Sequence, residues 1–123
     1  MQDQLYRDII LEHWKNPQNY GVLQNADIDI EADNPYCGDR IRLTIKLAKG
    51  EIKQVAFIGE GCAISKASAS LFTEEIRGGS ISDLQKIEGQ YTLDLLGISL
   101  TPTRTKCALL VYTTLKKGLK KSK

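Results

Sequence analysis

The sequence lacks any long hydrophobic run. No apolar stretch approaches the roughly 20 residues that are needed to cross a bilayer. The opening residues, MQDQLYRD, are polar and partly acidic, whereas a secretory signal joins a basic start to an apolar stretch. We therefore expect a protein that stays in the cytoplasm, where thiols are kept reduced, and that has no membrane partner.

A strong excess of charge is also missing. The 17 Lys and Arg residues nearly balance the 15 Asp and Glu residues, which leaves a formal charge of +2. Much of this excess lies in the terminal KKGLKKSK, which we expect to be a solvated, frayed end, with contact to an acidic partner surface as the alternative. Arginine and aromatic residues are not interleaved as in nucleic-acid-binding proteins. We therefore expect no nucleic-acid partner.

Cysteine is scarce: three are present, and no two of them form a CxxC pair. An odd number fits poorly with a framework of disulfides, so metal binding and thiol chemistry remain as the functional interpretations. The plain alternative is that each cysteine is a small buried hydrophobic residue.

The hydrophobic pattern predicts both helices and strands. Paired apolar residues at a spacing of four predict a helix over 4–15. Alternation of apolar and charged residues predicts an antiparallel hairpin over 39–59, with a short edge strand over 28–32 before it. Further helices are predicted over 62–77, 80–87 and 104–117, and the segment 89–102 is ambiguous between loop and helix.

These elements predict one α+β domain over residues 1–123. A chain of this length with 41% hydrophobic residues can build a single core. We expect a small three-stranded antiparallel sheet with helices packed on one face.

The three cysteines fall at predicted ends of elements. Cys37 lies in the turn before the second strand, Cys62 where the third strand gives way to a helix, and Cys107 in the first turn of the last helix. Asp39 follows two residues after Cys37. If the hairpin and both helix starts face the same end of the domain, these four side chains converge there. Three sulfur ligands and one oxygen ligand form a set that a tetrahedral zinc ion accepts.

Four segments, NPQNYG, NPYCGDRIRLTIKL, IGEGCAISKASASLFTE and TRTKCALL, occur in this order along the chain. In this combination the sequence resembles the U-type iron–sulfur cluster assembly proteins, the IscU, SufU and NifU N-terminal family, over nearly its whole length. The resemblance implies a compact α+β fold with a three-stranded antiparallel sheet. It also implies that the metal site of the family is formed here by Cys37, Asp39, Cys62 and Cys107.

The family has two branches that use this site differently. SufU-like members hold zinc and accept sulfur as a persulfide from a cysteine desulfurase, and they carry lysine or a similar residue before the third cysteine, as Lys106 does here. IscU-like members are scaffolds on which a 2Fe–2S cluster is assembled and transferred to apo-proteins, and they typically carry histidine at that position. The interval from Cys62 to Cys107 lacks the insertion that is usual in SufU-like members.

The resemblance to SufU makes Cys37 the expected catalytic sulfur acceptor, with Arg104 and Lys106 as cationic neighbours that favour thiolate or persulfide anions. The expected partners are a cysteine desulfurase and downstream iron–sulfur apo-proteins or assembly factors. We interpret the protein as a zinc-bound, sulfurtransferase-like carrier rather than a stand-alone enzyme, with a scaffold for a transient 2Fe–2S cluster as the alternative. A purely structural zinc domain ranks last, because a chain with its own amphipathic elements should fold without metal.

Overall fold

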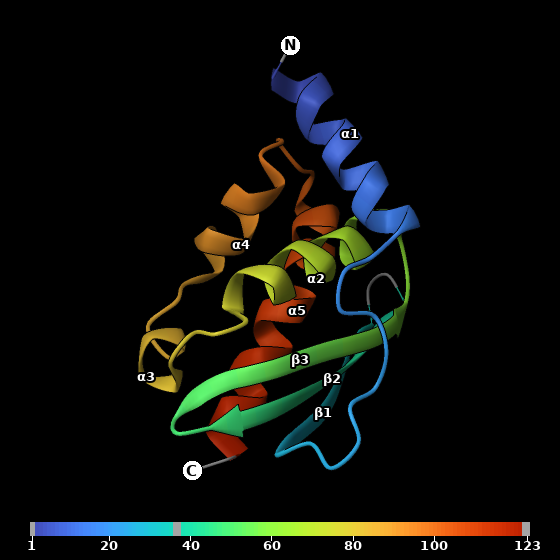
Figure 1. The fold of residues 1–123 in the computed structure, drawn as a ribbon. Coiled ribbons are helices and arrows are strands. Elements are labelled where there is room, and N and C mark those ends of the chain that lie inside the picture. Colours follow the sequence, from blue (N-terminus) through green and yellow to red (C-terminus); the bar gives the residue numbers. More distant parts are fainter. Residues whose placement is uncertain (1, 36–37, 122–123) are drawn as a thin grey trace.

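The computed structural model describes residues 2–35 and 38–121. The helices and strands follow in the order α1 (Gln2–Lys15), β1 (Ile28–Asn34), β2 (Asp39–Ala48), β3 (Glu51–Glu60), α2 (Ala63–Ile76), α3 (Ile81–Leu84), α4 (Gly89–Leu96) and α5 (Pro102–Lys121). Figure 1 shows the three strands as one sheet beside the helices, which confirms the predicted α+β fold. None of the described helices combines the length and the apolar character that a membrane-spanning helix requires.

The sheet has the strand order β1-β2-β3, and both neighbouring pairs are antiparallel. The hairpin predicted over 39–59 is therefore confirmed, as is the edge strand that precedes it. Lys49 and Gly50 form the hairpin turn with φ values of 53° and 78°. Positive φ at both central residues gives the kind of two-residue turn whose twist matches that of the flanking strands.

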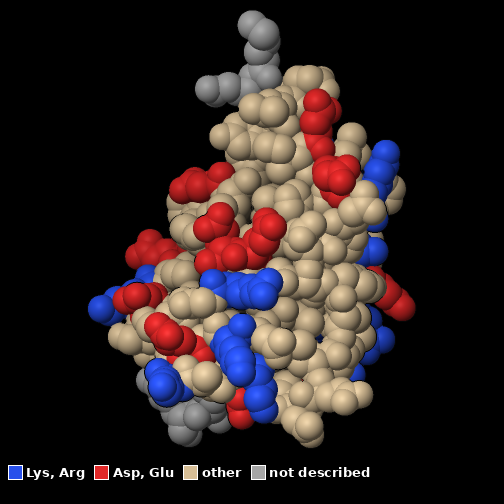
Figure 2. Space-filling view, viewed as in Figure 1, with Lys and Arg blue, Asp and Glu red and all other residues tan. Residues whose placement is uncertain are grey.

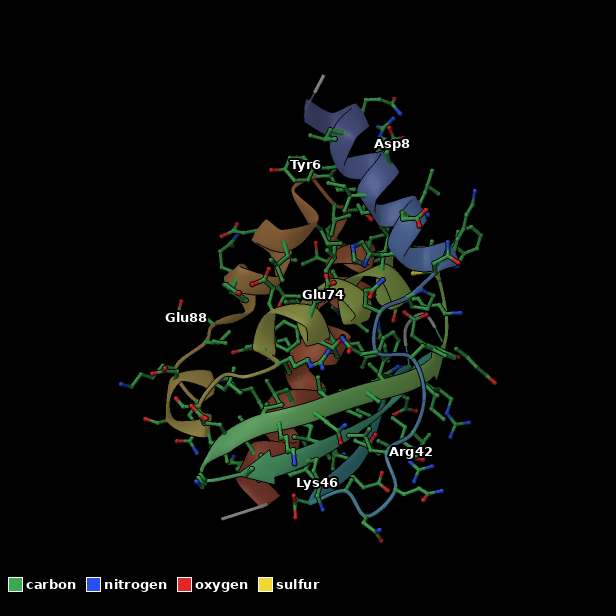
Figure 3. The ribbon with its side chains drawn as sticks, in the orientation of Figure 1. Tyr6, Asp8, Arg42, Lys46, Glu74 and Glu88 are labelled. Carbon is green, nitrogen blue, oxygen red and sulfur yellow. The ribbon has the colours of Figure 1, made fainter. Side chains whose placement is uncertain are left out.

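The core lies between one face of this sheet and the helices α2 and α5 (Figure 1). Alternate strand residues point into it, and the largest of its fully buried side chains are Phe57 and Phe72. Arg42 lies on the opposite face (Figure 3). It donates hydrogen bonds to both carboxylate oxygens of Asp29, at 2.9 and 2.7 Å. The sheet therefore has one apolar and one polar face, as the alternation predicts.

The face shown in Figure 2 carries acidic and basic side chains beside one another. The Lys and Arg side chains on it do not form a continuous field of one sign. This face therefore does not offer the extended basic surface that is typical of nucleic-acid binding.

Helix α5 begins earlier than the sequence pattern predicts. Thr101 accepts hydrogen bonds at the helix start, from the Arg104 N–H to its Oγ1 at 3.3 Å and from the Thr105 N–H to its carbonyl at 2.9 Å. Pro102 is then the first helical residue, where proline is well tolerated. Cys107 consequently lies in the second turn of α5, and its predicted place in the first turn is wrong.

The lysine-rich end belongs to α5, so the predicted frayed end is wrong for its described part. The helix continues to Lys121, and Leu119 is 2% exposed. A Cβ atom added to Gly118 would lie 2.9 Å from Cγ2 of Ile28. Glycine therefore lets this end of α5 lie directly against β1, and the apolar contact keeps the helix ordered.

The predicted short helix after residue 79 is shorter than expected. Ser80 Oγ accepts a hydrogen bond from the Asp83 N–H at 3.1 Å, as its capping role predicts. Helix α3 nevertheless ends at Leu84, whereas the sequence predicted a helix to Ile87. The Ile87 N–H bonds to the carbonyl of Leu84 at 3.3 Å, and this tighter turn ends the regular helix.

The ambiguous segment over 89–102 contains helix α4. Gly97 ends this helix at φ 67°, a conformation that glycine adopts readily. A Cβ atom at Gly97 would clash with the ring of Tyr6, which extends from α1 (Figure 3). Gly97 therefore both ends α4 and lets α1, the helix predicted over 4–15, lie close to it.

Candidate metal centre

Asp39 begins β2 in the register that faces the core. Ile41 and Leu43 follow it at every second position and are buried, so Asp39 points to the same side of the sheet. Asp39 is itself only 1% exposed. A buried carboxylate is costly unless partners compensate for its lost hydration, so the groups around Asp39 indicate its role.

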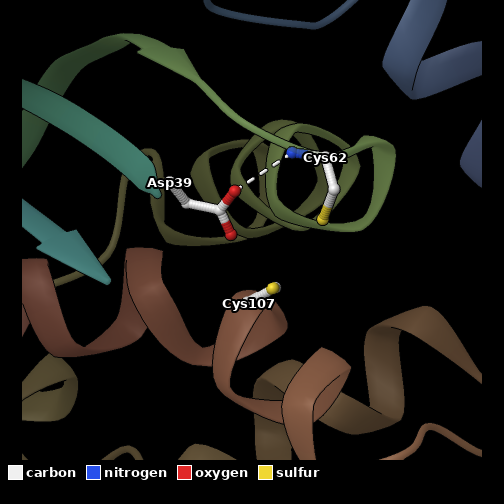
Figure 4. Close-up of side chains that lie close together, drawn as sticks. All are labelled: Asp39, Cys62 and Cys107. Carbon is white, nitrogen blue, oxygen red and sulfur yellow. Dashed lines mark hydrogen bonds between the residues drawn. The ribbon is translucent and has the colours of Figure 1, made fainter. Parts of the chain in front are cut away.

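Cys62 lies where β3 ends and α2 begins, as the sequence predicts. It is the N-cap residue of α2, and its own side chain makes no capping hydrogen bond. Its backbone N–H donates instead to Oδ1 of Asp39 at 3.1 Å (Figure 4). No acidic residue lies in the first turn of α2 itself. Asp39 therefore supplies the negative charge that stabilises a helix N-terminus.

Cys107 reaches the same place from α5. It is 2% exposed, and the residue after it, Ala108, is completely buried. The hydroxyl of Ser68 in α2 donates to the carbonyl of Ala108 at 2.6 Å, which joins the two helices directly. Ala67 of α2 is also completely buried. Small side chains thus bring α5 close enough to α2 for Cys107 to approach Cys62.

Asp39, Cys62 and Cys107 form one cluster. One ligand atom from each, a carboxylate oxygen and two sulfurs, lie within 4.8 Å of one another (Figure 4). Cys62 and Cys107 are not joined to each other by a disulfide. Oδ2 of Asp39 is buried and has no hydrogen-bond partner in the part of the chain that the structure describes. An unpaired buried acceptor costs about 1–3 kcal/mol, so a cation bound here would remove a real penalty.

The other predicted site residues have different positions. Cys37 lies outside the described residues. Arg104 and Lys106 are exposed on α5, whereas Cys107 on the same helix is buried. The structure thus brings together three of the four predicted ligands, and it places the two expected cationic neighbours on the surface.

Asn34 is a site residue that the sequence reasoning missed. It is the last residue of β1 and pairs with Asp39 across the sheet. Its Nδ2 lies 4.0 Å from Sγ of Cys107, as a hydrogen-bond donor to that sulfur. The alternation of Ile28 and Ile30 continues inward to Asn34, and this pattern could have identified a polar side chain directed at the core.

Gly61 is expected to control the position of Asp39. Its φ is 149°, and a Cβ atom there would overlap the carboxyl group of Asp39. We predict that Gly61→Ala lowers metal affinity by about tenfold or more, the usual cost of disturbing a metal site through a neighbouring group. A competition titration with a zinc chelator measures this affinity.

Gly21→Ala is the matched control for Gly61→Ala. Gly21 has nearly the same φ, 143°, but no atom lies within 4 Å of the added Cβ. Backbone strain should cost each variant about 1–3 kcal/mol of stability in urea, and only Gly61→Ala adds a contact with Asp39. Equal zinc affinities in the two variants would contradict the role assigned to Gly61.

Comparison with known proteins gives one family model and several similar proteins. A family model described as the NifU-like N-terminal domain matches residues 5–123. The zinc-dependent sulfurtransferase SufU of Bacillus subtilis (strain 168) is 44% identical over 136 residues, covering 97% of this chain and 92% of that protein. The iron–sulfur cluster assembly scaffold protein IscU of Streptococcus pyogenes serotype M1 is 34% identical over 136 residues, covering 96% and 84%.

A solved structure has the same fold over nearly the same length. It is an iron–sulfur cluster assembly scaffold protein for the SUF system from Fervidobacterium islandicum AW-1, with a TM-score of 0.77 and 26% sequence identity. The match covers 94% of this chain and 97% of that one. Similar proteins are therefore named both as a sulfurtransferase and as scaffolds, and both names concern sulfur or iron–sulfur clusters.

Proposed function

The chain belongs to the NifU-like N-terminal domain family, and from that premise we propose that it accepts sulfur from a cysteine desulfurase during iron–sulfur cluster biogenesis. The main observation in favour is the cluster of Asp39, Cys62 and Cys107, whose ligand atoms lie within 4.8 Å of one another. The 44% identity to a zinc-dependent sulfurtransferase supports the same function. We propose that residues 1–123 act as one domain in the cytoplasm.

Zinc is the metal that we propose for the site, with Cys37, Asp39, Cys62 and Cys107 as its ligands. Thiolate sulfur and carboxylate oxygen are both ordinary zinc ligands, and Oδ2 of Asp39 lacks any other partner among the described residues. When bound, zinc keeps thiols deprotonated at neutral pH without redox chemistry of its own.

Cys37 is the proposed sulfur acceptor. The resemblance to SufU favours Cys37, whereas Cys62 is the N-cap residue of α2 and its backbone N–H is bonded to Asp39. The Cys37 thiolate attacks the terminal sulfur of the persulfide on the desulfurase, and a new S–S bond forms on Cys37. The S–S bond of the donor breaks, and its electron pair leaves on the donor cysteine as a thiolate. The transfer therefore needs no added oxidant or reductant.

The remaining site residues have supporting roles in this proposal. Asp39 stays in place because its Oδ1 accepts the Cys62 N–H. Arg104 and Lys106 are exposed cations on α5 and would attract the persulfide anion towards the site. Iron–sulfur apo-proteins or other assembly factors would then take the sulfur.

An anaerobic sulfur-transfer assay tests this proposal. The zinc-loaded chain is incubated with a cysteine desulfurase and cysteine, and mass spectrometry locates any cysteine that gains the mass of one sulfur atom. We expect the added sulfur on Cys37 in the unaltered chain and none in Cys37→Ser. Zinc content is measured in the same samples, so that a loss of bound zinc in the variant is distinguished from the loss of the sulfur acceptor. No added sulfur on any cysteine would refute the proposed function.

A scaffold is the second candidate, because a relative named as a scaffold is 34% identical over 96% of this chain. Thiolates are also the usual ligands of a 2Fe–2S cluster, and Asp39 in place of a fourth thiolate would ease its release. Purification with iron and labile sulfide, and cluster transfer to an apo-protein, would favour the scaffold. A colourless protein with bound zinc would favour the sulfur acceptor.

A further inference from the structure

Asn34 approaches the candidate metal centre from β1 and is not one of the proposed metal ligands. We propose that Asn34 is a positioning residue that donates a hydrogen bond to the Cys107 sulfur and thereby keeps Cys107 from accepting sulfur. The part of this proposal that concerns sulfur rests on the proposed function. The hydrogen bond itself can be tested separately.

The position of Asn34 is set by the sheet. It occupies the inward register of β1 after Ile28 and Ile30, and it is 6% exposed. Across the sheet it pairs with Asp39, so the two polar side chains lie side by side at the end of the core. An apolar residue in this register would continue the core. A carboxamide here is therefore best explained by a polar group that it contacts.

One polar group that the Asn34 side chain contacts is the sulfur of Cys107. Nδ2 of Asn34 lies 4.0 Å from Sγ of Cys107, and both residues are buried. The sulfur atom is large and the bond is long, so the contact is weak for a thiol and would strengthen for a thiolate, which is a charged acceptor. The carboxamide adds no charge beside the carboxylate of Asp39. It can therefore stabilise a thiolate without competing with a cation for Asp39.

The backbone of Asn34 also contacts the start of β2. Its carbonyl accepts a hydrogen bond from the Gly38 N–H at 2.9 Å, and Gly38 has a φ of 72°. Asn34 therefore contacts Gly38 through its backbone and Cys107 through its side chain.

A donated N–H draws electron density from sulfur and makes a thiolate a poorer nucleophile. Cys107 should consequently remain a fixed ligand, while sulfur is accepted elsewhere. Without this hydrogen bond, the Cys107 thiolate could make the same displacement on the donor persulfide, with the donor cysteine leaving as a thiolate. The side chain of Asn34 therefore helps to determine which cysteine accepts sulfur.

Asn34→Leu and Asn34→Asp test the hydrogen bond. Both keep nearly the same side-chain size and remove the N–H donor, and the second also adds a negative charge. Thr92→Val is the matched control, since Thr92 is a completely buried polar residue whose Oγ1 has no partner in the described chain. Cobalt replaces zinc as the probe, because its sulfur-to-metal charge-transfer bands report the electron density on the thiolates.

We expect both Asn34 variants to shift these bands to lower energy and to weaken cobalt binding by about tenfold, with a larger shift for Asn34→Asp. Thr92→Val should change neither quantity. Unshifted bands in a folded Asn34 variant would overturn the proposal. If both variants fail to fold, NMR of the unaltered chain loaded with a magnetically active cadmium isotope tests the hydrogen bond instead. We expect coupling between cadmium and the Asn34 side-chain N–H. Absence of this coupling would refute the hydrogen bond.

The sulfur assay separates this proposal from the proposed function. We expect sulfur on Cys37 alone in the unaltered chain, and on both Cys37 and Cys107 in Asn34→Leu. Sulfur confined to Cys37 in both proteins would refute the effect of Asn34 and leave the proposed function intact. No sulfur on either protein would refute the proposed function, and the cobalt spectra would still test the hydrogen bond.

Discussion

Cys107→Ala is expected to lower the affinity for zinc by more than about a hundredfold. Loss of an outer partner of a metal ligand costs about 10–100-fold, and here a ligand itself is lost. Cys107 is 2% exposed within the second turn of α5, so water and neighbouring side chains cannot easily replace its sulfur. Competition with a chromogenic zinc chelator measures the change.

The same variant should lose the stabilisation that zinc gives to the fold. Zinc at 1,000 times its dissociation constant adds about 4.1 kcal/mol to the free energy of unfolding, and a chain that does not bind gains nothing. Thr114→Val is the control, because Thr114 is also a completely buried residue of α5. This variant should keep the rise in stability that zinc gives. A zinc-dependent rise in melting temperature that is equal in Cys107→Ala and the unaltered chain would rule out Cys107 as a ligand.

Phe72→Ala is expected to destabilise the metal-free chain by about 3–5 kcal/mol. Phe72 is completely buried in α2, where it packs in the core against the sheet. Its ring also lies 6.5 Å from that of Tyr91 in an edge-to-face arrangement. A typical domain has only about 5–15 kcal/mol of total stability, so this one change removes a large fraction. Urea unfolding followed by circular dichroism measures it.

Leu71→Ala is the control for Phe72→Ala. Leu71 is the preceding residue in α2 and is half-buried, so its truncation should cost clearly less. Because Cys62 is the N-cap residue of α2, loosening of this helix should also weaken the metal site. A loss of less than about 1 kcal/mol in Phe72→Ala would mean that α2 is not anchored to the sheet as described.

The sheet and most of the site could be predicted because alternation is a local property of the sequence. Apolar residues occupy every second position from Ile41 to Leu47, which predicts the hairpin and, one alternation earlier, the inward direction of Asp39. The change from β3 to α2 at Cys62 is likewise visible in the sequence. Convergence of these two residues follows from the topology alone.

The exact depth of Cys107 could not be predicted from apolar periodicity, since the helix begins before its first apolar residue. The start of α5 is set by capping at Thr101 and by Pro102. Neither residue contributes to the apolar periodicity from which the helix was predicted. The order of the lysine-rich end was missed for a related reason. Its burial depends on the close approach of Gly118 to Ile28, a tertiary contact between distant parts of the chain.

X-ray absorption at the zinc edge tests the central claim most directly, namely that Asp39, Cys62 and Cys107 hold one zinc ion in a sulfur-rich site. The account predicts that the purified chain retains zinc with a shell of sulfur atoms at about 2.3 Å and a single oxygen at about 2.0–2.2 Å, and that Asp39→Ala alters the oxygen contribution. A shell of nitrogen and oxygen atoms without sulfur would contradict it.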